Sequence, residues 1–213
     1  EYHPGKVFSS IDQNGRYAFG NQPSIASWNL ASLAGCLIAF INKDSDKANE
    51  LATEVLDNFS TETNQRILDL MCKKIGIDGA VKENQDLLRQ LLKIMMDNES
   101  DYTITFRSLA DVLEDKSDNF DKQFKDKTAI NEWLDNWKNI LSRDQRNILK
   151  IAEEMKLINP VCIPRNHQIQ KTIENAYDND FSKMQEMIKV VRKPFDEIKK
   201  YTSYTEAPTE DQK

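Results

Sequence analysis

The feature that most constrains the fold is a stretch without a charged residue from Ile25 to Ile41. Apolar side chains occupy positions 25, 28, 30, 33, 36, 37, 38, 40 and 41, which cover nearly every face of a helix. A helix that is apolar on all sides is stable in water only when neighbours cover it on all sides. Ser27, Asn29 and Ser32, together with a length at the lower limit for a span, favour a buried core helix over a membrane helix. We therefore predict one buried central helix, and no membrane partner.

The rest of the chain carries helical patterns. The clearest amphipathic stripe runs over 130–141, with Trp133 and Trp137 on one face, where they are typical of a packed core. Asp44 and Ser45 stand where they can cap one of the predicted helices, and Ser100 or Asp101 where either can cap another. No run of residues alternates as a half-buried strand does. The sequence therefore predicts an all-α fold.

These patterns divide the chain into three segments. Residues 1–22 contain closely spaced turn signals and are predicted to be a loop, and residues 23–198 form the helical body. Within this body the polar, charged segment 115–127 predicts a flexible surface loop. Residues 199–213 are polar and lose helical periodicity, so we predict a flexible tail there.

Composition excludes several classes of function. The net charge of −6 and the absence of a long basic cluster argue against a nucleic-acid partner. Cys36, Cys72 and Cys162 lack CxxC spacing and indicate reduced, intracellular thiols. His3 and His167 have no second ligand at a metal-binding spacing, and no glycine-rich phosphate loop is present. We therefore predict no catalytic, cofactor-binding or metal-binding residues in this chain.

A polar loop leads into the uncharged stretch and contains the residues of greatest interest. Arg16, Asn21 and Gln22 carry several hydrogen-bond donors each, and they stand close to Tyr17 and Trp28. Backbone groups of a loop that approaches a core need partners, which such side chains can supply. We predict that these five residues are structural and tie the loop to the central helix.

Two segments resemble one known family. The run GRYAFGNQPSIASWNL over residues 15–30 is similar to the GRYxxxNQPxIxxWNL segment of selenoprotein O (SelO, YdiU) proteins. A second, C-terminal set is similar to their NP…RNxxxQxAI…GDFS…LxRPFDE run, in matching order and approximate spacing. It contains Asn159-Pro160, Arg165-Asn166-His167, Asp180-Phe181-Ser182 and Arg192-Lys193-Pro194-Phe195-Asp196-Glu197.

The resemblance implies a protein-kinase-like fold in which one central hydrophobic helix organises the lower lobe. Proteins of this family transfer AMP from ATP to Ser, Thr or Tyr hydroxyls of other proteins, with Mg or Mn. Their nucleotide and metal ligands precede a DYGPFGF segment, and Glu1 resembles the position just after it. We therefore expect the helical C-terminal part of such an enzyme, with the upstream kinase-like half and protein substrates as partners. Phe8 replaces a cysteine common in the family, which puts thiol regulation in doubt.

Two other functions are compatible with the same residues. One is a non-catalytic helical module for protein interaction, and the other is a helical ligand-binding enzyme unrelated to kinases. The resemblance implies a cytoplasmic location if the protein is bacterial and a mitochondrial one if it is eukaryotic.

Overall fold

The computed structural model describes residues 1–212, and every regular element in this range is a helix, as the sequence predicts. The α-helices are α1 (Gln22–Ile41), α2 (Ser45–Lys74), α3 (Lys82–Asp97), α4 (Tyr102–Val112), α5 (Asp118–Asp121), α6 (Lys127–Leu141), α7 (Ile148–Ile158), α8 (Asn166–Tyr177) and α9 (Ser182–Val191). The short 3-10 helices are η1 (Phe19–Asn21), η2 (Lys199–Tyr204) and η3 (Glu210–Gln212).

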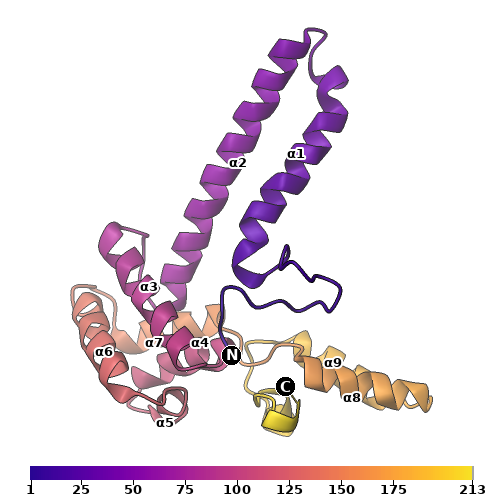
Figure 1. Cartoon of the computed structure of the whole chain (residues 1–213). Coiled ribbons are helices and arrows are strands. Elements are labelled where there is room, and N and C mark those ends of the chain that lie inside the picture. The colour runs from indigo at the N-terminus through magenta and orange to yellow at the C-terminus, as the bar shows by residue number, and fades with distance from the viewer. Residues whose placement is uncertain (213) are drawn as a thin grey trace.

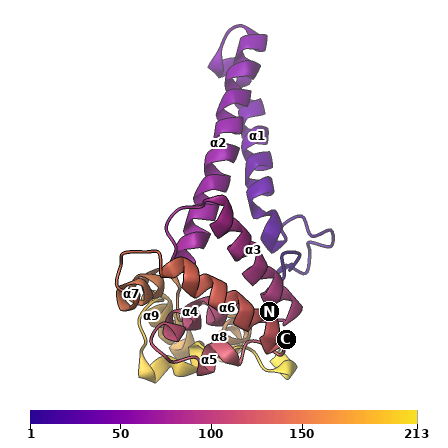
Figure 2. The same cartoon turned by 90° about the vertical axis from the view of Figure 1, so that its left-hand side faces the viewer.

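Two hairpins project from a compact base. Helices α1 and α2 form a long hairpin above the base of α3 to α7, and α8 and α9 form a second, shorter one beside it (Figures 1 and 2). The turn of the long hairpin is set by Asp44, whose carboxylate accepts hydrogen bonds from the backbone amides of Asp46 (3.0 Å) and Lys47 (3.3 Å). This cap satisfies donors that the first turn of α2 would otherwise leave unpaired.

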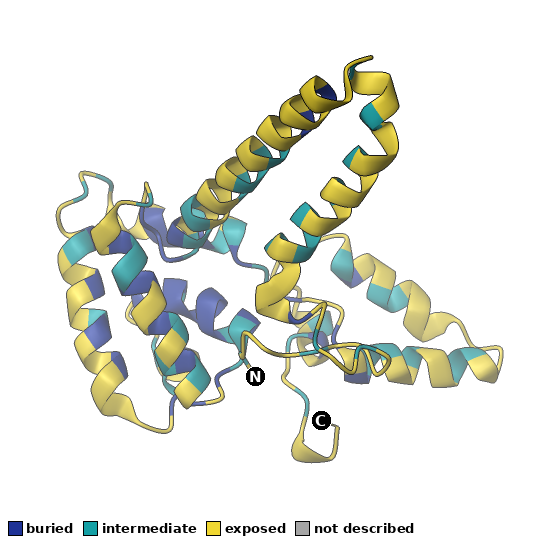
Figure 3. Cartoon of the chain, turned by 45° about the horizontal axis from the view of Figure 1, so that its top comes forward, coloured by how far each residue is buried: buried dark blue, intermediate teal, exposed yellow. Residues whose placement is uncertain are grey.

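The hydrophobic core lies in the base, and α4 is its most enclosed helix. Eight of the eleven residues of α4 are buried, among them Phe106 and Leu109. Figure 3 shows buried residues concentrated in the base and exposed residues along both hairpins. Buried side chains of α3, α4, α6 and α7 form one cluster with Ile75 and Ile77, which follow α2. Burial of this kind is the main stabilising contribution to a fold.

The predicted stripe of α6 faces the core. Trp133 and Trp137 are almost fully buried and stack with ring centroids 5.6 Å apart. The Nε1 atom of Trp133 donates to the Leu87 carbonyl oxygen at 2.8 Å, and that of Trp137 donates to the Ile75 carbonyl oxygen at 2.7 Å. Buried indole N–H groups need such acceptors. The two tryptophans therefore fix α6 against both α3 and the end of α2.

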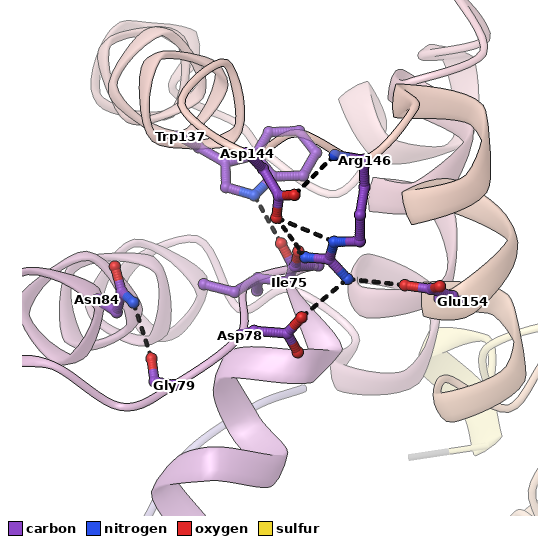
Figure 4. Close-up of polar contacts among 9 residues, drawn as sticks. Ile75, Asp78, Gly79, Asn84, Trp137, Asp144, Arg146 and Glu154 are labelled. Atoms are coloured by element: carbon purple, nitrogen blue, oxygen red, sulfur yellow. Dashed lines mark hydrogen bonds and ion pairs between the residues drawn. The ribbon is translucent and has the colours of Figure 1, made fainter.

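A glycine turn connects the long hairpin to α3. Gly76 (φ 76°) and Gly79 (φ 79°) have left-handed backbone conformations that other residues adopt at a cost. At Gly76 the space is also closed, because a Cβ atom would lie 2.6 Å from Cγ2 of Ile151. The Asn84 side-chain amide donates to the Gly79 carbonyl oxygen at 2.7 Å (Figure 4). The sequence thus specifies a sharp change of direction between α2 and α3.

Arg146 holds this turn from the side of α7. Its guanidinium donates to the Gly76 carbonyl oxygen at 3.0 Å. It also pairs with the carboxylates of Asp78 (3.1 Å), Asp144 (2.6 Å) and Glu154 (2.7 Å), as Figure 4 shows. A planar guanidinium can serve several acceptors at once. Arg146 thereby joins the α2–α3 turn, the segment before α7, and α7 itself.

The prediction of a buried central helix over Ile25–Ile41 is wrong for this chain. No residue of α1 is buried, because α2 packs along one side of it and leaves the rest exposed. The uncharged pattern predicts that apolar groups pack around α1. It does not predict whether residues 1–212 supply those groups. The central position belongs to α4, which is shorter and more polar.

Two polar segments contain more structure than predicted. The segment 115–127 includes α5, and Phe120 and Phe124 are buried in the core. Residues 199–204, at the start of the predicted tail, form η2, where Tyr204 is buried against Cys162 and donates to Glu186 at 2.9 Å. In both places isolated aromatic residues anchor a segment whose average composition is polar.

Candidate functional site

The candidate site is the surface of the long hairpin together with the loop that leads into it. The loop is closed by Asp12, whose carboxylate accepts from the backbone amides of Arg16 (2.9 Å) and Tyr17 (2.7 Å). The Asn21 amide donates to the Arg16 carbonyl oxygen at 3.0 Å, and the Gln22 amide donates to the Tyr17 carbonyl oxygen at 2.7 Å. Side chains at the start of α1 therefore bind the loop backbone.

Arg16 lies against an aromatic side chain of α1. Its guanidinium carbon is 4.1 Å from the ring centroid of Trp28 and 5.8 Å from that of Tyr17. Such cation–π contacts stabilise exposed sites by about 0.5–1 kcal/mol. The five loop residues selected from the sequence are thus brought together. Their contacts are solvent-exposed rather than core contacts, and their structural role stays a prediction.

An aromatic cluster anchors the beginning of the chain to the base. It contains Tyr2, Phe19, Tyr102 and Phe106, with neighbouring ring centroids 4.8–6.0 Å apart. The Tyr2 amide also donates to the Ser100 carbonyl oxygen at 2.7 Å. Sequence reasoning missed this cluster, because its members come from three separate segments and follow no single periodicity. Asp12 was also missed, although its place just before Asn14-Gly15 is typical of a turn.

One side of α1 exposes a continuous apolar stripe, which we name the α1 face: Leu33, Leu37, Phe40 and Ile41. These residues have the i, i+4, i+7, i+8 spacing of one helical face. Leu33 is 54% exposed and Phe40 is 86% exposed. Helix α2 contributes the buried Ala48 and Ala52 to the hairpin, where small side chains allow close packing. Large contiguous apolar patches usually mark interaction sites.

The segment Phe19–Ile41 is also long and apolar enough to cross a membrane. None of its most apolar window is buried in the described structure. Length and composition alone do not separate a span from a helix that packs against protein. The predicted absence of a membrane partner therefore stays a prediction.

The C-terminal residues selected from the sequence occupy a different part of the molecule. Arg165 precedes α8, is buried, and binds Asp101 with two hydrogen bonds of 2.6 and 3.1 Å. The Pro194 carbonyl oxygen accepts from the backbone amides of residues 161 (2.7 Å) and 162 (3.2 Å). Asn166 and Arg192 are exposed, at the start of α8 and just after α9. These contacts attach the second hairpin to the base.

Asp101 links this region to α4. Its carboxylate also accepts from the Ile104 amide at 2.9 Å, which caps α4 as predicted. Burial alone would raise the pKa of Asp101, but the hydrogen bonds and the positive charge of Arg165 outweigh it and keep the pKa below its usual value. The ion pair is therefore retained at neutral pH. It joins the second hairpin to the most buried helix.

Acidic and basic side chains are plentiful in residues 1–212, but they do not gather into a metal-ligand cluster. Within residues 1–212, no group of three or more His, Cys, Asp or Glu side chains lies close enough to hold a metal ion. The acidic and basic groups instead form pairs such as Lys156 with Asp111 (2.8 Å) and Glu114 (2.6 Å). What this arrangement provides is apolar contact area on the hairpin and a shaped loop beside it.

Comparison with known proteins agrees with the family resemblance of the two sequence segments. The family model described as "Protein adenylyltransferase SelO" matches residues 1–192. A protein nucleotidyltransferase YdiU of Maridesulfovibrio salexigens is 39% identical over 97% of this chain and 42% of the relative's length. YdiU proteins of Rhizobium johnstonii and Agrobacterium fabrum are 38% and 39% identical, over 97% and 98% of this chain. The chain spans less than half the length of each of these relatives.

Proposed function

The chain belongs to the SelO family, and we propose that it is the helical C-terminal part of a protein adenylyltransferase. The parent would transfer AMP from ATP to Ser, Thr or Tyr hydroxyls of protein substrates. Support comes from the match over residues 1–192 and from relatives that are more than twice as long. The relatives are bacterial, which supports a cytoplasmic location for a bacterial parent. A mitochondrial one would apply to a eukaryotic parent.

Nucleotide and metal would be bound outside this chain. ATP with Mg or Mn is expected for the parent, yet residues 1–212 do not assemble a metal-ligand cluster and do not fit that role. The role of this chain is therefore support of the fold and docking of protein. We expect the isolated chain not to bind ATP appreciably, which calorimetry with ATP and magnesium would test.

The observation that carries the proposal is the α1 face. The helix with the most continuous apolar sequence has no buried residue. Full burial of an exposed Leu or Phe side chain stabilises by roughly 1.5–3 kcal/mol, so covering Leu33, Leu37 and Phe40 would stabilise an interface substantially. We assign this cover to the kinase-like half that we expect upstream of this chain in the parent. In the parent protein, α1 would then be the predicted buried central helix, and the upstream half would supply the side chains that bury it.

The loop beside α1 would shape the same interface. The Asp12, Asn21 and Gln22 hydrogen bonds fix the loop backbone next to the start of α1. Rigid loops bind with a smaller loss of conformational freedom than mobile ones do. Arg16 and Trp28 would then present one preformed surface to the upstream half.

A non-catalytic interaction module is the second candidate. It is favoured by the combination of exposed apolar hairpins with the absence of a metal-ligand cluster in residues 1–212. It predicts binding to another protein without any contribution to AMP transfer. A helical ligand-binding enzyme, the third possibility named from the sequence, has less support. The cleft of about 1010 Å³ beside α4 is partly open to solvent, and charged side chains that line it pair with one another, as Lys156 does with Asp111 and Glu114.

A chimera separates the first two candidates. The N-terminal part of the Maridesulfovibrio relative, up to its match with Glu1, is fused to this chain, and transfer of radiolabelled AMP from ATP to protein is measured. We expect transfer by the chimera and none by the chain alone. Leu37→Asp should reduce transfer by at least about tenfold, since a buried unpaired charge is costly.

Asn49→Asp provides the matched control. It adds the same charge at an exposed polar position of α2, away from the α1 face, and should leave transfer unchanged. The interaction module would be favoured if the chimera folded but transferred no AMP, while the N-terminal part of the relative and this chain bound each other tightly as separate proteins. Equal activity of the Leu37→Asp chimera and its parent would exclude the α1 face as the interface.

A further inference from the structure

We propose that the second hairpin binds the upstream half of the parent through an apolar surface of its own, which we name the α8–α9 face: Ile173, Tyr177, Phe181, Met184 and Ile188. This contact rests on the proposed function and extends it. The upstream half would then be held on two sides, by the α1 face on the long hairpin and by the α8–α9 face on the short one.

The α8–α9 face is exposed in this chain. Ile173 and Tyr177 are four residues apart on α8, and Met184 and Ile188 are four residues apart on α9, so each pair lies on one side of its helix. Tyr177, at the end of α8, is 83% exposed. Among residues 1–212, α8 and α9 pack mainly against each other, and η2 contacts α9. Large apolar side chains that gather in this way are typical of an interaction site.

The chain enters the structure at the feet of both hairpins. The ring of Tyr2 lies 6.0 Å from that of Phe19, just before α1. On the other side is Asp101, which binds Arg165 before α8. Burial raises the pKa of Asp101 and Arg165 lowers it, and the amino group of Glu1 is close enough to lower it as well. Polypeptide that precedes Glu1 in the parent therefore starts where the two hairpins diverge from the base (Figures 1 and 3).

The size of the upstream half brings it against both hairpins. The 210 matched residues are 42% of the Maridesulfovibrio relative, which leaves about 290 residues outside the match. A compact domain of that size has a radius of gyration of roughly 19 Å and a diameter of about 40–50 Å. Helix α1, with 20 residues, is about 30 Å long, and α8, with 12 residues, is about 18 Å long. A body that begins at their feet and covers α1 is large enough to cover the α8–α9 face too.

The point of attachment also favours the upstream half over other occupants. A partner tethered beside its docking surface is present there at an effective concentration in the millimolar range, without any cost of bringing two molecules together. A second copy of this chain or a protein substrate has no such advantage. Both would compete with the tethered half for the same apolar side chains.

Hydroxyl-radical footprinting, read by mass spectrometry, tests the contact on this chain and on the chimera described above. Tyr177, Phe181 and Met184 carry ring or sulfur groups that the radical modifies readily. Their modification rates should fall at least about fivefold on fusion, because the core of an interface is packed as densely as a protein interior. Leu149, which is exposed at the start of α7, is the reference and should keep its rate.

Phe40 on the α1 face reports on the proposed function in the same experiment. Protection of Phe40 with unchanged rates at Tyr177 and Met184 would overturn the second contact and leave the proposed function intact. Protection of neither face in a chimera that circular dichroism shows to be folded would overturn both. Protection of the α8–α9 face alone would support the second contact and remove the first. If the chimera aggregates, this chain mixed with the separately produced N-terminal part of the relative is labelled instead, and the outcomes have the same meaning.

Two other results would assign the α8–α9 face to a different occupant and overturn the proposal. Protection that appears in the isolated chain as its concentration rises would assign the face to a second copy. Protection of the chimera that appears only after a protein substrate is added would assign it to the substrate.

A pair of variants tests whether the face contributes to binding. Tyr177→Ser removes a large ring, and Lys171→Ser removes an exposed side chain of the same helix about a third of a turn away. Binding of this chain to the separately produced N-terminal part is measured by calorimetry. Tyr177→Ser should weaken it about tenfold, as loss of a central aromatic residue does in other interfaces, and Lys171→Ser should leave it unchanged. Equal affinities of the Tyr177→Ser and Lys171→Ser chains would overturn the proposal.

Discussion

Helices α1 and α4 differ in composition and in burial, and the more apolar of the two is the more exposed. Helix α1 has 20 residues without a charge, and none of them is buried. Helix α4 has 11 residues, including Arg107, and eight of them are buried. The difference lies in their neighbours. Within residues 1–212, α2 packs along α1 and η1 contacts its start, whereas α4 contacts α5 and α7 and shares the hydrophobic core of the base.

Burial of α4 is possible because its polar side chains have partners. The Arg107 guanidinium donates to the carbonyl oxygens of Lys156 (2.7 Å) and Asn159 (3.1 Å), and it pairs with Glu197 at 2.8 Å. The Ser108 hydroxyl donates to the Ile104 carbonyl oxygen at 2.7 Å. A buried polar group is costly only when it is unpaired. Helix α4 thus pairs the terminal guanidinium nitrogens of Arg107 and the Ser108 hydroxyl within this chain, although the buried Nε of Arg107 has no hydrogen-bond partner among the described residues.

The largest expected effect is in the base. Trp137→Ala should lower the free energy of unfolding by about 3–5 kcal/mol, because it opens a cavity in a fully buried site. It also leaves the Ile75 carbonyl oxygen without its indole donor. Urea unfolding followed by circular dichroism measures the change.

Trp28→Ala is the matched control in the hairpin. Trp28 is 54% exposed and contacts Arg16, so its loss should cost no more than about 1 kcal/mol. If the two tryptophan variants were equally unstable, the contrast between base and hairpin would not hold.

A second prediction concerns the turn that joins the two regions. Gly76→Ala should destabilise by about 2–4 kcal/mol, since the left-handed backbone costs about 1–2 kcal/mol and overpacking adds a similar amount. The added Cβ would lie 2.6 Å from Ile151 and 2.9 Å from the Met155 sulfur. Thermal unfolding is a suitable measurement, because each kcal/mol shifts the midpoint by about 2–4 °C at this size.

Gly79→Ala separates the two contributions. Gly79 has a similar φ of 79°, but no atom lies within 4 Å of its added Cβ. It should therefore show only the backbone cost of about 1–2 kcal/mol. Equal destabilisation by both variants would mean that the contacts of Gly76 with α7 do not matter.

The smallest expected effect is on the α1 face. In the isolated chain, Leu33→Ala should cost less than about 1 kcal/mol, because the side chain is already 54% exposed. In the chimera described above, the same change should cost about 2–5 kcal/mol, as in packed cores. Differential scanning calorimetry of both proteins gives the comparison.

Leu91→Ala, at a fully buried position of α3, is the control and should be costly in both proteins. A large effect of Leu33→Ala in the isolated chain would show that something covers the α1 face in solution. Sedimentation analysis would then show whether a second copy provides that cover.

Part of the structure could be predicted from residue patterns. The stripe of α6, the caps at Asp44 and Asp101 and the all-helical class follow from local spacing, and the structure confirms them. The burial of Phe120 and Tyr204 did not follow, because each stands in a polar segment with one aromatic neighbour a single turn away, which is too little to establish a helical period. The loop residues Arg16, Asn21 and Gln22 could be selected by residue type. Their partner Asp12 and the aromatic cluster at Tyr2 could not.

The sequence by itself determined which segments are helical, where several of them begin, and that the helix over Ile25–Ile41 is apolar on nearly every face. These properties depend on side chains a few residues apart, whose relative positions a helix fixes. Tertiary structure alone decided which helix is central. Burial depends on contacts between distant segments, such as Trp137 with Ile75 and Arg165 with Asp101, and no local spacing encodes them. For that reason the polar α4 is enclosed, and the apolar α1 remains open to a partner.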